Sequence, residues 1–467
     1  MTPDTLQANA WCGQRVEGAF DDAAAAWAAQ PGFLAPPALP LGFKPADLRD
    51  WKHPDVGWGL VVPDDPNRSG ADKSRGLDLP EPLQALIKQR GDAPVLRWFP
   101  GLTDGRLRRY AGDGKAADLR LSGARGTAAN AVPRYLLVAA SPKAIPWRVQ
   151  YQLQTEAFVG RLDLPPEGLA RYVAALMADW SGSATKHRGQ PLLWAVDHGH
   201  PDITRLMRKT VADRLAQSLG ADAEFAMAGG YLTDGQATVS GLVQALLQRN
   251  PAFVMTSSHG ATFPLSDAAA LRANLGLPVD LAHQLLSPAA LNGWDASGCI
   301  WVAHACCSAG ADDASSFAPL FQGASTLAQT LAAVAQAGPC QAPLPTALLG
   351  GAHPARAFIG HVEPTFDWTL RDPVTGQSTT QSLVDSFYQG LHAERDATLG
   401  SMPVGMALDA HYRSVASLLL SHIEALDEIN QHAAGAEDRA LRAKLMAMDR
   451  LAMVILGDPT VGLAVTA

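Results

Sequence analysis

The chain has 467 residues, of which 47% are hydrophobic and 18% are charged, and its formal net charge at pH 7 is −8. A chain of this length and composition buries a large core and has room for two to three domains of average size. The negative charge and the lack of a long basic cluster disfavour nucleic acid as a main partner. No apolar run approaches the roughly 18 residues that predict a membrane span.

The five cysteines are too few, and odd in number, for a disulfide framework in a chain of this size. The first residues do not combine a basic segment with an apolar stretch, so no secretory signal is predicted. We therefore expect a cytoplasmic protein that does not associate with membranes.

The first part of the chain divides into two predicted regions. Residues 1–90 are rich in Pro, Trp, Ala and Asp, and they predict an irregular N-terminal leader. Residues 91–170 predict a small α/β subdomain, with a buried strand from Tyr135 to Ala140 and a short strand at Gly160 and Arg161. A helix is expected from about Pro165, because proline is favoured in the first helical turn.

Residues 171–467 alternate between short apolar runs and helical patterns. Strands are expected for PLLWAV before Asp197, for AEFAMA at 223–228, for the run before His259, for the run before Cys306 and for ARAFIG at 355–360; helices are expected at 202–219, at 240–249, after residue 316 and from 404 to 451. This alternation predicts a three-layer α/β/α sandwich with a mainly parallel sheet.

The two most informative runs are FVMTSSHG, which ends in His259 and Gly260, and CIWVAHAC, which ends in Cys306. Open α/β sheets place their chemistry beyond the carboxyl ends of such strands, so a base and a nucleophile would meet there. A His about 50 residues upstream of a catalytic Cys is also the caspase arrangement. We therefore predict that His259 removes the thiol proton of Cys306.

Two neighbouring residues bear on this chemistry. Glycine after the His allows the backbone to approach a scissile carbonyl closely, so the N–H groups of Gly260 and Cys306 are candidate oxyanion donors. Cys307 is the rival nucleophile, but consecutive strand residues point in opposite directions, and the Ala-Cys pattern favours Cys306. The structural alternative is a buried core Cys and an unrelated loop His.

The order of several motifs resembles the gingipain family of the caspase-like clan over roughly residues 95 to 467. The segments RYLLVAASPKAIP, FVGRL, LLWAVD, SSHG, AHAC and ILGDP are each similar to a block of that family and occur in the same order. The chain departs from the family pattern at Ser258, where another glycine is usual. The resemblance implies a thiol protease that needs no cofactor.

The resemblance also assigns roles to three further residues. Asp197 corresponds to the acid that orients the catalytic imidazole, and its alternative is a solvated strand-end or helix-capping Asp. Asp202 corresponds to the base of the S1 pocket, which would pair with Arg more strongly than with Lys, and its alternative is a helix N-cap. His304 corresponds to a position that lines S1, and its alternative is a buried core histidine.

Other candidate sites are weaker. His198, His200 and Asp202 do not have a spacing typical of zinc ligands, so no metal is predicted. His361 and Glu363 follow the next strand and are candidates for the rim of the cleft, or for a plain loop.

We therefore predict a cysteine endopeptidase that cleaves a protein or peptide substrate after basic residues, with a regulatory protein as a candidate partner. Two alternatives stay open. One is a caspase-like signalling or scaffold module that a partner activates. The other is a cysteine hydrolase that acts on a non-peptide acyl group.

Overall fold

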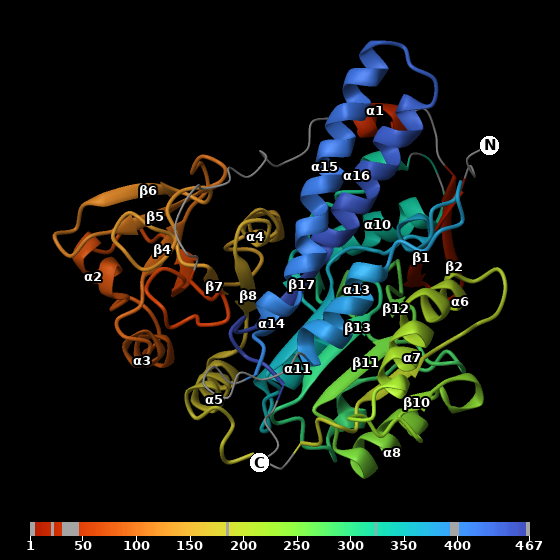
Figure 1. Cartoon of the computed structure of the whole chain (residues 1–467), viewed down its shortest axis with the longest axis horizontal. Helices are drawn as coiled ribbons and strands as arrows, with labels where there is room; N and C mark the ends of the chain where they lie inside the picture. Colours follow the sequence, from red (N-terminus) through yellow and green to blue (C-terminus); the bar gives the residue numbers. More distant parts are fainter. Residues whose placement is uncertain are drawn as a thin grey trace.

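The computed structural model describes residues 5–19, 23–29, 46–183, 186–321, 323, 325–392 and 401–463. Its main feature is a twelve-stranded sheet (Figure 1). In order across the sheet, the strands are β10 (Tyr231–Leu232), β9 (Leu192–Ala195), β11 (Phe253–Ser257), β13 (Ile300–His304), β16 (Ala357–His361), β17 (Met453–Gly457), β8 (Phe158–Leu162), β7 (Tyr135–Ala139), β3 (Trp58–Pro63), β4 (Val95–Trp98), β5 (Arg106–Tyr110) and β6 (Ala116–Arg120).

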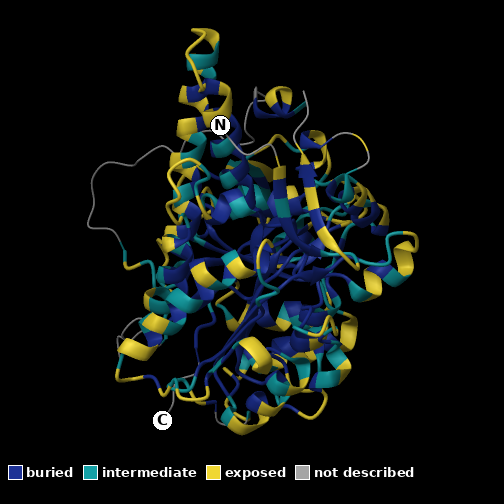
Figure 2. Cartoon of the chain, turned by 90° about the vertical axis from the view of Figure 1, so that its right-hand side faces the viewer, coloured by how far each residue is buried: buried dark blue, intermediate teal, exposed yellow. Residues whose placement is uncertain are grey.

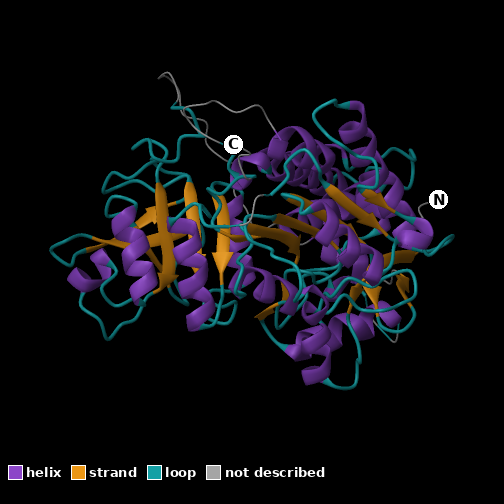
Figure 3. Cartoon of the chain, turned by 90° about the horizontal axis from the view of Figure 1, so that it is seen from below, coloured by secondary structure: helices purple, strands orange, loops and turns teal. Residues whose placement is uncertain are grey.

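The sheet is mainly parallel; among its neighbouring pairs, β16–β17, β4–β5 and β5–β6 are antiparallel. Helices lie on both sides of the strands (Figure 3), which makes a three-layer α/β/α sandwich and confirms the predicted fold class. Strands covered on both faces need apolar side chains at nearly every position, and β11, β13, β16 and β17 are buried throughout. Figure 2 shows this buried interior, with exposed residues on the outer helices.

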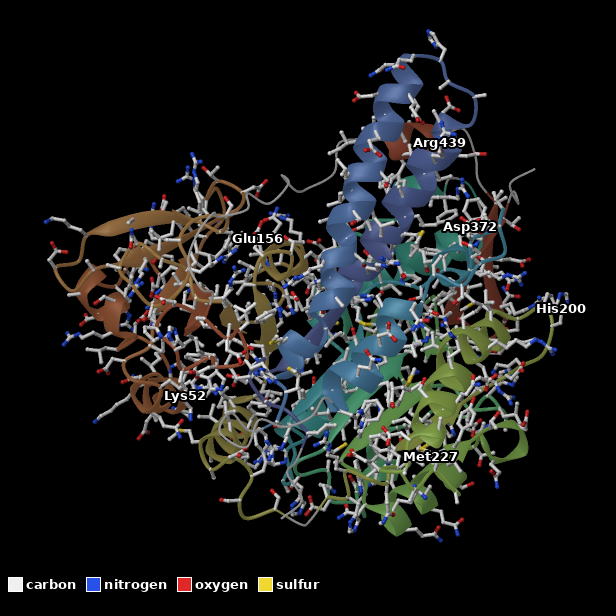
Figure 4. All side chains as sticks on the ribbon, in the orientation of Figure 1. Lys52, Glu156, His200, Met227, Asp372 and Arg439 are labelled. Atoms are coloured by element: carbon white, nitrogen blue, oxygen red, sulfur yellow. The ribbon has the colours of Figure 1, made fainter. Side chains whose placement is uncertain are left out.

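The α-helices connect and cover the strands. They are α1 (Ala23–Ala29), α2 (Gly70–Arg75), α3 (Glu81–Gln89), α4 (Trp147–Gln154), α5 (Pro166–Met177), α6 (Ile203–Met207), α7 (Asp213–Ala221), α8 (Val239–Arg249), α9 (Ala268–Asn274), α10 (Thr326–Ala337), α11 (Pro343–Gly350), α12 (Asp367–Leu370), α13 (Gln381–Asp385), α14 (Val404–Ala407), α15 (Asp409–Asn430) and α16 (Ala436–Ala452). The long hairpin of α15 and α16 projects from the body of the molecule, with Arg439 near its tip (Figures 1 and 4). Among the described residues, no helix combines the length and apolar character needed to cross a membrane.

The structure corrects the prediction for residues 1–90. The irregular leader ends well before residue 90, because β3 lies inside the main sheet between β7 and β4, and α2 and α3 follow it. The strand was missed because the Pro- and Asp-rich sequence on both sides of WGLVV hides a short apolar run. Residues 30–45 of the predicted leader lie outside the described residues, and the division into three parts stays a prediction.

A second correction concerns the strand predicted at 223–228. This segment is not a strand; the edge strand β10 forms later, at Tyr231–Leu232. Ala and Glu are depleted in strands, and here the segment instead buries Phe225 in the core and donates a backbone hydrogen bond from Ala226 to Gly189.

The N-terminal residues form a separate small sheet. Here β1 (Thr5–Trp11) pairs with β2 (Arg15–Ala19) on one edge and with β12 (Gly260–Ala261) on the other. Since β12 directly follows His259, the start of the chain reaches the carboxyl edge of the main sheet. A further two-stranded sheet joins β14 (Gly310–Ala311) to β15 (Cys340–Gln341).

Candidate active site

The register of two neighbouring strands places the predicted base and nucleophile at the same edge of the sheet. Strands β11 and β13 are parallel partners, and Ser257 lies opposite His304. His259 and Cys306 each follow two residues later, so both leave the sheet at the same level. Both are fully buried.

Gly260 is where these two segments meet. A Cβ atom added at Gly260 would lie 1.9 Å from the carbonyl oxygen of Cys306 and 2.9 Å from its backbone nitrogen. Such distances are far below van der Waals contact, so only glycine allows the backbone after His259 to lie against the backbone of Cys306. The structure thus brings together three of the residues singled out from the sequence.

The imidazole of His259 is held by Asp202. Its Nε2 lies 3.0 Å from Oδ2 of Asp202, whose other oxygen accepts hydrogen bonds from the backbone N–H of Thr204 at 2.9 Å and from its hydroxyl at 2.5 Å. Burial alone would raise the pKa of Asp202, but the hydrogen bonds from His259 and Thr204 hold it well below its usual value. Asp202 is therefore a carboxylate that favours a proton on Nε2.

This hydrogen bond decides which imidazole nitrogen can act as the base. With Nε2 donating to Asp202, Nδ1 carries the lone pair, and Nδ1 has no hydrogen-bond partner among the described residues. The arrangement resembles the acid and base of a catalytic triad, in which a carboxylate fixes the tautomer of the base. His259 can thus accept a proton at Nδ1.

The contacts of the two aspartates can be compared with their predicted roles. Asp197 accepts a hydrogen bond from the backbone N–H of Gly199 at 2.8 Å and lies 3.7 Å from the guanidinium of Arg208. It is Asp202 that contacts His259. Asp202 is also the N-cap of α6, as one alternative held, and both of its oxygens are engaged.

His304 is buried, and its contacts are with the interior. Its Nδ1 lies 3.5 Å from the hydroxyl of Ser257, and its ring lies 5.6 Å from that of His361. Burial lowers the pKa of His304 to about 4, which keeps the ring neutral. These are contacts of a buried histidine, and its place in the lining of S1 stays a prediction.

Cys306 and Cys307 differ in their surroundings. Their sulfur atoms lie 3.3 Å apart, and Cys307 has a left-handed backbone with φ of 52°. A hydrogen bond with Cys306 and burial together raise the pKa of Cys307 well above its ordinary value, which disfavours its thiolate. Cys306 stays the predicted nucleophile of the two, on the Ala-Cys pattern of the sequence. All five cysteines lie in the described part of the chain, and none forms a disulfide.

A narrow cavity borders both cysteines and is also lined by Asp312 and Glu363. Glu363 accepts hydrogen bonds from the hydroxyl of Ser315 and the backbone N–H of Ser316, both at 2.7 Å. Burial raises the pKa of Glu363 to about 7. Glu363 thus lines the same cavity as Cys306 and Cys307, and its place at the rim of a substrate cleft stays a prediction.

Sequence reasoning missed an aromatic stack over the candidate base. The ring of Trp11 lies 4.3 Å from that of His283, 6.0 Å from that of His198 and 5.5 Å from that of His259. Burial, and next the neighbouring His259, lower the pKa of His198 to about 4. The alternation of Leu6, Ala8 and Ala10 before the turn at 12–14 was the signal for β1, whereas nothing in the sequence marks His283.

His198, His200 and Asp202, which were considered as metal ligands, each have a different environment. Asp202 is engaged with His259, His198 belongs to the aromatic stack, and His200 lies on a loop at the periphery (Figure 4). Among the described residues, no group of three or more His, Cys, Asp and Glu side chains could hold a metal ion.

Comparisons with known proteins add little to this geometry. No family model matches the chain, and no curated protein matches it. A solved structure described as "Structure of Protease" is similar over 88% of this chain and 78% of its own, at 12% sequence identity and a TM-score of 0.44. A likeness at this level does not bear on activity.

Proposed function

We propose that the protein is a cysteine endopeptidase in which Cys306 is the nucleophile, His259 the base and Asp202 the residue that orients the base. The observation that carries the proposal is the buried hydrogen bond from His259 to Asp202, which leaves Nδ1 of the imidazole as a proton acceptor, while the next residue, Gly260, lies against the backbone of Cys306. A carboxylate, an imidazole and a thiol in this order supply what acyl transfer requires.

In the proposed reaction, Nδ1 of His259 takes the proton of the Cys306 thiol, and the thiolate attacks the peptide carbonyl. The N–H groups of Gly260 and Cys306 donate hydrogen bonds to the developing oxyanion. The imidazolium, stabilised by Asp202, then protonates the leaving amine. Finally, His259 removes a proton from water, which hydrolyses the thioester and regenerates the thiol.

The predicted preference for Arg over Lys depends on Asp202 at the base of S1. In the present arrangement this carboxylate accepts hydrogen bonds from His259 and Thr204, so guanidinium binding would require one of them to leave. We therefore propose the endopeptidase activity independently of basic specificity. A cytoplasmic location and a regulatory partner stay predictions.

The test is a library of fluorogenic peptides that varies the residue before the cleaved bond. After residues 1–13 have been cut away from the folded protein, the wild-type sequence should hydrolyse a subset of the library, and Cys306→Ala prepared in the same way should hydrolyse none of it. Hydrolysis of acyl esters or thioesters without any peptide hydrolysis would favour the non-peptide hydrolase instead.

A further inference from the structure

The N-terminal hairpin of β1 and β2, residues 5–19, lies directly on the candidate active site. Its first strand pairs with β12 in a parallel register, with Ala10 opposite Gly260 and Trp11 opposite Ala261. The backbone N–H of Thr262 donates to the carbonyl of Trp11 at 3.0 Å. An extended segment of this chain therefore occupies the edge of the strand that follows the base.

The same strand is also fixed by the segment that follows β16. The backbone N–H of Asn9 donates to the carbonyl of Thr365 at 3.2 Å, and the side-chain oxygen of Asn9 accepts from the N–H of Thr365 at 3.0 Å. Ala8 also forms a bridge with Phe366. Thus β1 spans from the loop after β16 to the loop after β11, across the end of β13 where Cys306 lies.

Side chains of the hairpin also cover the site. The ring of Trp11 lies against that of His259 with a tilt of 33°, and Leu6, Ala8 and Ala10 are buried in the same apolar cluster as Cys306. Neither His259 nor Cys306 has measurable exposure. A peptide substrate could not reach the thiol while this hairpin is in place, although the polar groups of the site are arranged for chemistry.

The hairpin is anchored by its buried apolar side chains and by backbone hydrogen bonds to the segments that follow β11 and β16. The helix α1, which follows it, is fixed by the indole N–H of Trp27, which donates to the carbonyl of Ser316 at 3.0 Å, and by the contact of Lys444 with the carbonyl of Trp27. Extended peptides commonly bind by adding a strand to an exposed sheet edge, and β1 uses the edge of β12 in this way.

We propose that residues 5–19 are an inhibitory segment that occupies the binding position of an extended peptide at β12, with Trp11 closing over His259, and that this hairpin must be displaced before Cys306 can react. The inference rests on the proposed function only in taking a peptide as the ligand that replaces β1. The exposure of Cys306 can be measured without any peptidase activity, so the inhibitory hairpin and the endopeptidase function can fail separately.

The first test compares Trp11→Ala with Trp51→Ala, a partly buried tryptophan of the other end of the molecule. The rate of Cys306 alkylation by iodoacetamide is followed by mass spectrometry of the digested protein. Loss of an aromatic stack should raise this rate about three- to tenfold in Trp11→Ala. The rate in Trp51→Ala should match that of wild type, and equal rates in all three proteins would contradict the proposal.

The second test removes the strand after the protein has folded. A specific protease site is inserted after Gly13, where an added Cβ would meet no atom within 4 Å. The folded protein is cut, and the released peptide is washed out in mild urea until mass spectrometry no longer detects it; circular dichroism confirms the fold. Alkylation of Cys306 should rise at least about tenfold, because the strand and Trp11 no longer cover the thiol. The backbone hydrogen bonds of such an added strand supply most of its affinity for the edge, so the cut strand must be washed out completely.

Adding back a synthetic peptide of residues 5–13 should restore protection, whereas the same peptide with Trp11→Ala should restore less. Unchanged alkylation after the strand has left would overturn the proposal. If Cys306 becomes reactive but the cut protein hydrolyses no peptide, the inhibitory hairpin stands and the endopeptidase function falls.

Discussion

Nε2 of His259 and Oδ2 of Asp202 are 3.0 Å apart in the interior of the protein, although 57 positions separate the two residues in the sequence. Asp202 reaches this position because it caps the helix α6, whose start lies beside the carboxyl end of β9. One side chain thus satisfies the helix terminus with one oxygen and the imidazole with the other.

This relationship predicts the effect of Asp202→Asn. An amide cannot favour the proton on Nε2 as a carboxylate does, so kcat/KM should fall by about two to four orders of magnitude for every peptide that wild type cleaves. Helix α6 should keep its cap, because Asn is nearly as good an N-cap as Asp. The measurement is kcat/KM across the peptide library for enzyme with the N-terminal strand removed, with unfolding in urea as the control for stability.

The matched control is Asp197→Asn. Asp197 contacts Gly199 and Arg208, so its amide variant should keep most of the activity. A loss in Asp202→Asn that is confined to Arg substrates would instead restore Asp202 to the base of S1. A large uniform loss in Asp197→Asn would return the orienting role to that residue.

Removal of either reacting group should abolish hydrolysis. Cys306→Ala and His259→Ala are each expected to lose nearly all activity, and the double variant should lose no more than either single one, because the groups act as a unit. Cys307→Ala should keep most activity, since the raised pKa of Cys307 makes it a poor nucleophile. Initial rates in enzyme with the N-terminal strand removed provide the comparison.

Gly260→Ala tests the contact between the two catalytic segments. The added methyl group would lie 1.9 Å from the carbonyl oxygen of Cys306, so the backbone must shift at a cost of about 2 to 4 kcal/mol. Gly182→Ala is the control, because a Cβ there would meet no atom within 4 Å. Urea unfolding of both variants measures the difference, and equal stabilities would contradict the close approach.

Asp449 predicts a pH dependence of stability. Burial raises its pKa from an ordinary 3.8 to about 7, in spite of hydrogen bonds with Thr369 and Thr365. Between those two values the folded protein holds a proton that the unfolded chain has released, so this group's contribution to stability falls as pH rises from about 4 to about 7.

The variant Asp449→Asn should therefore gain stability relative to wild type as pH increases over that range. Thermal unfolding at pH 5 and at pH 8 measures the effect. If the difference in Tm between variant and wild type is the same at both pH values, Asp449 is not protonated in the folded protein as described.

Much of the sheet could be predicted because buried parallel strands are short, apolar and bounded by polar residues. The runs before His259 and Cys306 have this form, and both are strands that end two residues before the predicted position. Strand β3 was missed for the opposite reason, since its apolar residues stand within a Pro- and Asp-rich segment.

The candidate site was less predictable where it depends on contacts between distant segments. His259 and Cys306 could be paired from strand order alone. Whether Asp197 or Asp202 faces the imidazole depends on the path of the loop before α6, and the sequence does not specify that path. The position of Trp11 could not be predicted, because it results from the pairing of β1 with β12, in which Trp11 lies opposite Ala261, far away in the sequence.

The most direct measurement of the central claim is the location of the adduct formed by a peptidyl acyloxymethyl ketone on the protein after removal of the N-terminal strand. The account predicts a covalent adduct on Cys306 that forms at least about a hundredfold more slowly in His259→Ala. An adduct on Cys307, or modification of Cys306 at the same rate with and without His259, would contradict it.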